Sequence, residues 1–289
     1  MCPNRSGMVL VLFLASPSLP EETTPVHPPR LEAWFRELST PGPGEPFGRY
    51  LARAGRIQHG VAYDTAASPP PGPERLRIEL ERFECVTFIE STLAVARCGY
   101  VGEPTAECFT REIVQSRYRG GVLSDYASRL HYFTEWIDDN ESRGRLRNLT
   151  GQLGGIPVRK DFFRISTHEL ARASAEDELA RKMRSVEARL SGIPHLVVPR
   201  ESARSASTAL EDGDIVAFVR ERPGFLVHHA GFVLHVRGDP RLLHASSYHQ
   251  KVVITAEDVA DYLLRRPERK GVIVARPTEP KPGSKQKAP

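Results

Sequence analysis

Three side chains in this sequence are of the types needed for nucleophilic catalysis: Cys85, His229 and His244. A thiolate can attack a carbonyl carbon, an imidazole with a pKa near neutrality can move the proton, and a third polar group can orient the imidazole. Together they are the parts of a cysteine hydrolase. The cysteines contain no C-x-x-C pair, which argues against a structural zinc site. We therefore expect neither a metal nor an organic cofactor.

Cys85 lies where a charged run gives way to a helical pattern, in "ELERFECVTFIESTLAVARCGY". Apolar residues recur after it at helical spacing, as at Val86, Ile89 and Leu93, and predict a mostly buried helix with Cys85 in its first turn. A helix N-terminus carries free N–H groups and a partial positive charge, which would lower the pKa of the thiol. The alternative is that Cys85 is a small buried hydrophobe, as many unpaired cysteines are.

The two histidines belong to "LVHHAGFVLHVRGDPRLLHASS", which we interpret as two strands joined by a hairpin turn. Strand alternation puts these residues on one face: Val227, His229, Gly231 and Val233. His228 then faces the other way. A turn centred on residues 237–238 pairs Gly231 with His244, so that His229 and His244 become diagonal neighbours, roughly 7–8 Å apart at Cα. A loop of odd length would separate them unless a bulge restored the register.

The secondary-structure elements that must position these residues are predicted to be mostly helices up to residue 192 and strands after it. Helical patterns fill most of the chain up to residue 192, including "RLEAWFRELS", "PTAECFTREIVQSRYR", "SDYASRLHYFTEWIDDNESRG" and a long polar helix that Thr167 would cap. A proline-rich connector at 67–74 predicts an exposed loop. Strands follow in "HLVVP", "DIVAFV", "FLVHHAGFVLHV", "RLLHASS", "KVVI" and "GVIVARP". Helices followed by a sheet of short strands predict an α+β fold.

Composition narrows the class of protein. The 289 residues, 40% hydrophobic and 26% charged, are typical of a globular protein with a sizeable core. The net charge is only +4 and the basic residues are scattered, so nucleic-acid binding is not indicated. No apolar run approaches the ~20 residues that span a bilayer. We expect one domain over 27–276 and a disordered basic tail over 277–289.

The N-terminal residues bear on the compartment. In the first 20 residues a basic residue precedes a short apolar run, then small residues and prolines, the pattern of a weak secretory signal. A disordered leader is the alternative. We expect export to the periplasm or cell envelope, with the cytoplasm as the alternative. An oxidising compartment would permit a disulfide between Cys98 and Cys108, although their spacing alone does not argue for one, and we expect Cys85 to stay free.

Four segments in this order resemble the N-acetylmuramoyl-L-alanine amidase-like family of bacterial cell-wall hydrolases: "RFECVTFIESTLAVA", "GVLSDYASRLHYFTEWIDDN", "HHAGF" and "LLHASS". The resemblance runs from about residue 60 to 276, and "DYASRLHYF" is its most specific part. This family is placed in the NlpC-type branch of papain-like cysteine peptidases. The resemblance therefore implies a papain-like core, in which the nucleophile helix packs on an antiparallel sheet. Further helices would lie on the N-terminal side and between nucleophile and base.

Matched position by position, the resemblance implies that Cys85 is the nucleophile, His229 the base and His244 the residue that orients it. Glu84 stands where the family usually has Asp. In related cell-wall peptidases that acid helps to bind the free amine of a terminal L-alanine. Tyr63 matches loosely a substrate-binding tyrosine of such enzymes. Two further candidates for substrate contact are Arg129 and His131, for which buried structural hydrogen bonding is the alternative.

The resulting hypothesis is a peptidoglycan hydrolase that cleaves the amide between the muramoyl lactyl group and L-alanine through a thioester. The enzymatic alternative is a γ-D-glutamyl–diamino acid endopeptidase of the same superfamily. Alternatives of another class are a non-catalytic wall-binding module, which would not need a thiol at Cys85, and an acyltransferase, which would need a second, apolar acyl pocket. The expected partner is peptidoglycan or muropeptide fragments. The oligomeric state and the bond cleaved are not determined by the sequence.

Overall fold

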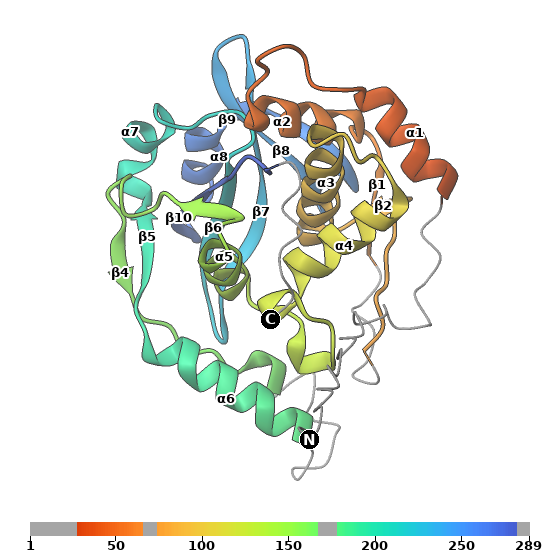
Figure 1. The fold of residues 1–289 in the computed structure, drawn as a ribbon. Coiled ribbons are helices and arrows are strands. Elements are labelled where there is room, and N and C mark those ends of the chain that lie inside the picture. Colours follow the sequence, from red (N-terminus) through yellow and green to blue (C-terminus); the bar gives the residue numbers. More distant parts are fainter. Residues whose placement is uncertain (1–27, 66–73, 167–177, 282–289) are drawn as a thin grey trace, which may run out of the picture.

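A curled, mostly antiparallel sheet runs through the protein, with helices on both of its faces (Figure 1). The computed structural model describes residues 28–65, 74–166 and 178–281. The predicted leader, nearly all of the proline-rich connector, Thr167 with the start of its helix, and most of the basic tail lie outside the described residues. Among the described residues, no helix is long and apolar enough to cross a membrane.

The described helices confirm the expected distribution, with two before the nucleophile helix and several between it and the strands of the histidines. They are α1 (Pro28–Leu38), α2 (Phe47–Ile57), α3 (Cys85–Tyr100), α4 (Ala106–Arg117), α5 (Phe133–Ser142), α6 (Glu178–Gly192), α7 (Ala203–Ser207) and α8 (Val259–Leu264). Short 3-10 turns are η1 (Arg119–Gly121), η2 (Tyr126–Ser128) and η4 (Arg200–Ser202).

The strands predicted in the C-terminal half are all present, and four short strands were missed. The short ones are β1 (Ala62–Tyr63), β2 (Arg82–Phe83), β3 (Leu146–Asn148) and β4 (Ile156–Val158). The others are β5 (His195–Pro199), β6 (Ile215–Arg222), β7 (Phe225–Val236), β8 (Asp239–Ser246), β9 (Lys251–Asp258) and β10 (Arg269–Pro277). Their order in the sheet is β2-β1-β9-β8-β7-β6-β10-β5-β4, with β3 paired to β10. The predicted α+β class is confirmed.

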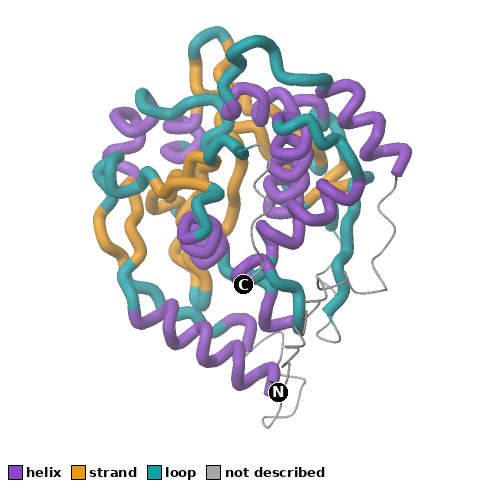
Figure 2. Tube along the Cα trace, in the orientation of Figure 1, coloured by secondary structure: helices purple, strands orange, loops and turns teal. Residues whose placement is uncertain are grey.

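Two hydrophobic clusters cover the two faces of the sheet. The larger cluster joins α2 and α3 to one face, as where Phe88 meets Phe232 with ring centres 5.8 Å apart. The smaller cluster joins α7 and α8 to the other face, around Val216, Phe218 and Leu242. Figure 2 shows the strands between these two groups of helices. Helix α3 contacts both β7 and β8, the strands that carry the histidines.

One predicted helix is shorter than expected. The pattern over 124–144 predicts a continuous helix, but only η2 and α5 form in it. Between them the chain is extended, because the N–H of Leu130 donates to the carbonyl of Arg117 (2.9 Å) rather than to its own helix. Asp125 caps the short η2 turn by accepting from the N–H of Ser128 (3.0 Å). Pairing with α4 therefore overrides the local helical pattern.

Candidate active site

Helix α3 begins at Cys85 because the residue before it forms a complete N-cap. Glu84 has extended backbone angles, and its two carboxylate oxygens accept from the N–H groups of Val86 (3.0 Å) and Thr87 (2.7 Å). Thr87 returns the contact by accepting from the N–H of Glu84 (3.1 Å), which completes a capping box. The predicted position of Cys85 in the first turn is confirmed, and capping occupies both oxygens of Glu84.

The Cys85 thiol is held as a neutral group in this structure. Burial raises its pKa well above the ordinary value, and the neighbouring carboxylate of Glu84, which accepts from the thiol at 3.4 Å, raises it further. The N–H groups of Ala230 and of Cys85 itself act in the opposite direction. The expectation of a lowered thiol pKa at the helix terminus is therefore wrong, because burial and an adjacent acid outweigh the helix dipole.

The contact with Ala230 places the sulfur against strand β7, one residue after His229. Strands β7 and β8 pair from the hairpin turn only as far as Phe232 and Leu243. Beyond that pair the ladder between them ends, and α3 approaches both strands. Gly231 lies in this stretch, where an added Cβ would come within 2.8 Å of the Cβ of His244. A side chain at residue 231 would therefore push His244 out of place.

His229 and His244 form a hydrogen-bonded pair, with 2.6 Å between Nε2 of His229 and Nδ1 of His244. Burial lowers the pKa of His229 well below its ordinary value and lowers that of His244 to about 3. Both imidazoles are therefore neutral at physiological pH. Among the described residues, no hydrogen bond to Nδ1 of His229 is present, so that nitrogen is available to a proton donor. The predicted juxtaposition of the two histidines is confirmed, as is the turn at 237–238.

A β-bulge at His228 corrects the predicted alternation. His229 pairs with Phe218, but the next pair joins Val227 to Val219, which leaves His228 as the extra residue. Val227 therefore packs with the larger cluster, away from the face of His229 and Phe218. The ring centre of His228 lies 6.4 Å from that of His229, so His228 is not turned fully away. Alternation within one strand could not reveal a residue that the partner strand skips.

Tyr63 lies beside the nucleophile, at the start of the sheet. Its strand β1 pairs in parallel with β2, which leads directly into Glu84 and Cys85. Burial is the main cause that raises the pKa of Tyr63 to about 12, and the acidic groups of the neighbouring Cys85 and Glu84 contribute. A neutral hydroxyl therefore lies close to the thiol. Its contact with substrate stays a prediction.

Arg129 and His131 are held by other parts of the protein. Arg129 donates from Nε to the buried carboxylate of Glu74 (3.0 Å), and this charge raises its pKa although burial opposes the shift. His131 is hydrogen-bonded through Nε2 to the carbonyl of Tyr126 (2.7 Å), and burial lowers its pKa to about 3. These contacts are structural ones. A role for either residue in substrate binding stays a prediction.

Three residues near the histidine pair were missed by sequence reasoning: Phe218, Tyr262 and Arg269. Phe218 on β6 packs against His229, Tyr262 on α8 packs against His244, and the guanidinium of Arg269 on β10 lies over the ring of Tyr262. No local motif marks them, because they approach the site only through the sheet order. Among the described residues, no group of three or more His, Cys, Asp or Glu side chains could hold a metal ion.

Fold and site together describe a mixed α+β protein in which the N-terminus of a buried helix meets a pair of histidines on a curled sheet. Residues 54–272 match the model of the N-acetylmuramoyl-L-alanine amidase-like family, and the chain belongs to that family. It is therefore an amidase-like member of the peptidoglycan hydrolases. A comparison with curated proteins gave no match.

Several solved structures are similar to this chain, and one of those described here is named an N-acetylmuramoyl-L-alanine amidase. An N-acetylmuramoyl-L-alanine amidase from Bacteroides uniformis is 28% identical, with a TM-score of 0.73 over 80% of this chain and 99% of that one. A Bacteroides fragilis protein whose name proposes a xylanase is 29% identical, with a TM-score of 0.70 over 77% and 98%. A Legionella pneumophila protein assigned to a domain of unknown function shares the fold at 17% identity and a TM-score of 0.64, over 82% and 90%.

Proposed function

We propose that this protein is a cysteine amidase with a papain-like, NlpC-type core that hydrolyses the N-acetylmuramoyl–L-alanine bond of peptidoglycan or its fragments. The observation that carries the proposal is the histidine pair, 2.6 Å from nitrogen to nitrogen, one residue away from the backbone N–H that contacts the Cys85 thiol. This supports the proposal, because a cysteine hydrolase needs a thiol, a base and a group that orients the base close together.

The proposed reaction starts from a neutral thiol and a neutral imidazole. As the Cys85 sulfur bonds to the lactyl carbonyl carbon, its proton passes to Nδ1 of His229. The N–H groups of Cys85 and Ala230, which contact the sulfur in the free protein, are candidates for stabilising the oxyanion. The C–N bond then breaks, and His229 returns the proton to the departing amine of L-alanine. Water, deprotonated by His229, hydrolyses the thioester and restores the thiol.

The capping role of Glu84 favours the amidase over the endopeptidase. An enzyme that requires a free L-alanine amine needs an anion beside the nucleophile. Here both carboxylate oxygens of Glu84 already accept from helix N–H groups. In an amidase substrate the nitrogen is acylated and uncharged, so no such anion is required. The endopeptidase remains the second candidate because Tyr63 and Glu84 both lie beside Cys85.

The test is incubation with two substrates, followed by mass spectrometry of the products. One is an N-acetylmuramoyl-peptide, and the other is the sugar-free peptide L-Ala-γ-D-Glu-diaminopimelate. We expect free peptide to be released from the first substrate and the Cys85→Ala variant to release none. Cleavage of the sugar-free peptide alone would favour the endopeptidase. Binding to purified cell walls without cleavage of either substrate would favour the binding module.

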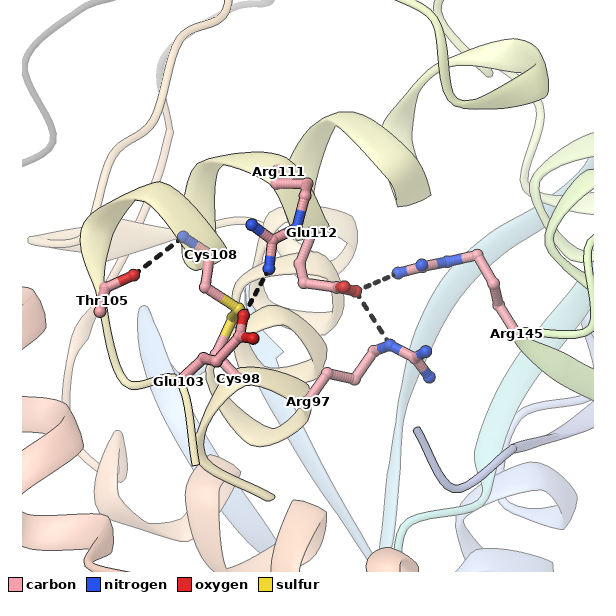
Figure 3. The surroundings of a disulfide bond; sticks show 8 residues. All are labelled: Arg97, Cys98, Glu103, Thr105, Cys108, Arg111, Glu112 and Arg145. Atoms are coloured by element: carbon pink, nitrogen blue, oxygen red, sulfur yellow. Dashed lines mark hydrogen bonds and ion pairs between the residues drawn. A yellow bond between two sulfur atoms is a disulfide. The ribbon is translucent and has the colours of Figure 1, made fainter. Parts of the chain in front are cut away.

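We further propose that the protein is exported to the periplasm or cell envelope. The disulfide between Cys98 and Cys108, which joins α3 to α4, supports this proposal (Figure 3). Structural disulfides persist mainly in oxidising compartments. The check is cell fractionation with acid quenching and thiol alkylation of the native protein. Recovery from the cytosol with both cysteines alkylated would contradict export.

A further inference from the structure

Four aromatic rings form a closed cluster behind the histidine pair. His229 and His244 have ring centres 4.7 Å apart, and His244 meets Tyr262 at 5.5 Å in an edge arrangement. Tyr262 meets Phe218 at 5.0 Å, and Phe218 stacks on His229 at 6.3 Å. These residues come from β6, β7, β8 and α8. Each histidine is therefore held on one side by the other histidine and on another side by a ring without a hydrogen-bonding nitrogen.

Arg269 closes the cluster from the start of β10. Its guanidinium carbon lies 3.8 Å from the ring centre of Tyr262 and 5.4 Å from that of Phe218, and it donates a hydrogen bond to the carbonyl of Tyr262. Only 8% of Arg269 is exposed, and within the described parts of the chain it forms no ion pair. A buried cation without a carboxylate partner is costly, which makes its place beside a candidate active site significant.

The proposed role of His229 as the base requires one particular tautomer of His244. If Nδ1 of His229 is to accept the thiol proton, Nε2 of His229 must carry a hydrogen and donate it to Nδ1 of His244. Nε2 of His244 must then be an N–H. This atom is buried, and within the described residues it has no hydrogen-bond partner. An aromatic face is electron-rich and can receive an N–H, whereas it repels a lone pair.

We propose that Tyr262 and Arg269 are positioning residues that select the Nε2–H tautomer of His244 and keep the histidine pair unprotonated. The ring of Tyr262 receives the N–H of His244, and Arg269, stacked on the same ring, holds it in place. The cation of Arg269 also makes protonation of either imidazole less favourable. The role in catalysis rests on the proposed cysteine mechanism, but the tautomer and the charge state of the free protein do not.

Several charged or titratable groups face the pair, and Arg269 is the permanent cation among them. His228 lies beside His229 on β7, His249 follows β8, and the Cys85 thiol on α3 contacts the N–H of Ala230, the residue after His229. Burial is the main cause of the lowered pKa of His244, and Arg269 is the next. Removing this cation should therefore raise the pKa of the pair, while the neutral thiol and the phenol of Tyr262 leave it little changed.

The first test is nitrogen NMR of the ligand-free protein labelled at histidine, which identifies the protonated ring nitrogens without any assay of activity. We expect His244 to be the neutral Nε2–H tautomer and to remain neutral down to pH 5. Tyr262→Phe, which keeps the ring, should retain this tautomer, and Tyr262→Leu should lose it. A neutral Nδ1–H form of His244 in the wild type, or the same tautomer in Tyr262→Leu, would overturn the proposal.

The second test removes the cation. In Arg269→Gln we expect the protonation of the histidine pair, and the acid limb of kcat/KM, to move to higher pH by on the order of one unit. Arg269→Lys should restore both, because it keeps the charge. Lys270→Gln removes the adjacent, half-exposed cation and should move neither. If the Lys and Gln variants of Arg269 behave alike, the guanidinium only packs and the proposal fails. If the NMR results are as expected but the protein hydrolyses no muropeptide, the proposed function is wrong and the inference about the tautomer stands.

Discussion

Two regions of this protein bury titratable side chains, and they treat them in opposite ways. In the network of ion pairs around α4, every charge has a partner of opposite sign. Arg117 and Glu90, 8% and 4% exposed at their side chains, are joined at 2.7 Å. Glu112 accepts from both Arg97 (2.9 Å) and Arg145 (2.6 Å), beside the disulfide in Figure 3. At the candidate active site, no carboxylate of the described residues pairs with the imidazoles: His229 and His244 bond to each other, and His228 bonds to the backbone of Phe218.

The comparison separates stability from chemistry. A buried charge that is paired and hydrogen-bonded keeps little unused hydrogen-bonding capacity, and removing its partner destabilises the fold. His244 keeps an unpartnered Nε2, His228 an unpartnered Nδ1, and Arg269 an uncompensated charge, all among the described residues. Such groups are costly to bury, and three of them at one histidine cluster mark it as a candidate functional site.

The largest expected effect is on the nucleophile. We expect Cys85→Ser to lower the rate of muropeptide hydrolysis by at least roughly 10³-fold, because a serine hydroxyl in a site shaped for a thiol is a poor nucleophile. Circular dichroism and the melting temperature should be nearly unchanged. Wild-type rates in this variant would contradict cysteine catalysis and would mean that Cys85 has only a structural role.

The adjacent histidines provide the next contrast. We expect His229→Ala to lower kcat by about 10²-fold or more, the usual contribution of a general base. His228→Ala should change kcat by about tenfold or less, since His228 is the extra residue of the bulge and is not bonded to His244. Steady-state kinetics on the two variants check this ranking. The reverse ranking would mean that His228 is the base.

In the ion-pair network the effect should fall on stability instead. Arg117→Met leaves the Glu90 carboxylate buried without its partner, and we expect a loss of about 3 kcal/mol in the free energy of unfolding. Arg111→Met removes a cation whose pair with Glu103 is half exposed, and should cost about 1 kcal/mol or less. Urea titrations measure both, and kcat of the folded fraction should be unchanged. A lowered kcat in Arg117→Met would contradict the prediction that the ion-pair network contributes to stability and not to catalysis.

We expect the smallest effect at Glu84, which caps helix α3 and also lies beside the nucleophile. Glu84→Gln keeps one oxygen that can accept from a helix N–H group, but it places an amide NH2 beside the other N–H group and removes the carboxylate. We expect it to cost about 1 kcal/mol or less of stability and to retain most amidase activity. Thermal unfolding and the muramoyl-peptide assay are the measurements. Loss of all activity with unchanged stability would show that the carboxylate contacts the substrate.

The sequence predicts the parts of this site better than their exact arrangement. Hydrophobic alternation predicted β7 and β8, and the helical spacing after Cys85 placed the nucleophile at a helix start, because both signals are local. The bulge at His228 depends on how β7 pairs with β6, and a single strand does not contain that information. Tyr262 and Arg269 reach the histidines through the sheet order β8-β7-β6-β10 and through α8, which sequence patterns do not determine.

Four histidines with strongly lowered pKa values make folding a proton-linked equilibrium. The pKa values of His131 and His244 are lowered to about 3 and that of His228 to about 4, with His229 also well below its ordinary value. An unfolded chain binds these protons near pH 6.5 and the folded chain does not, so the stabilisation is full above that pH. Below it, each group removes up to about 1.4 kcal/mol of unfolding free energy per pH unit. Mild acid should therefore lower the free energy of unfolding, and urea titrations at pH 8 and pH 5 that give equal midpoints would refute this.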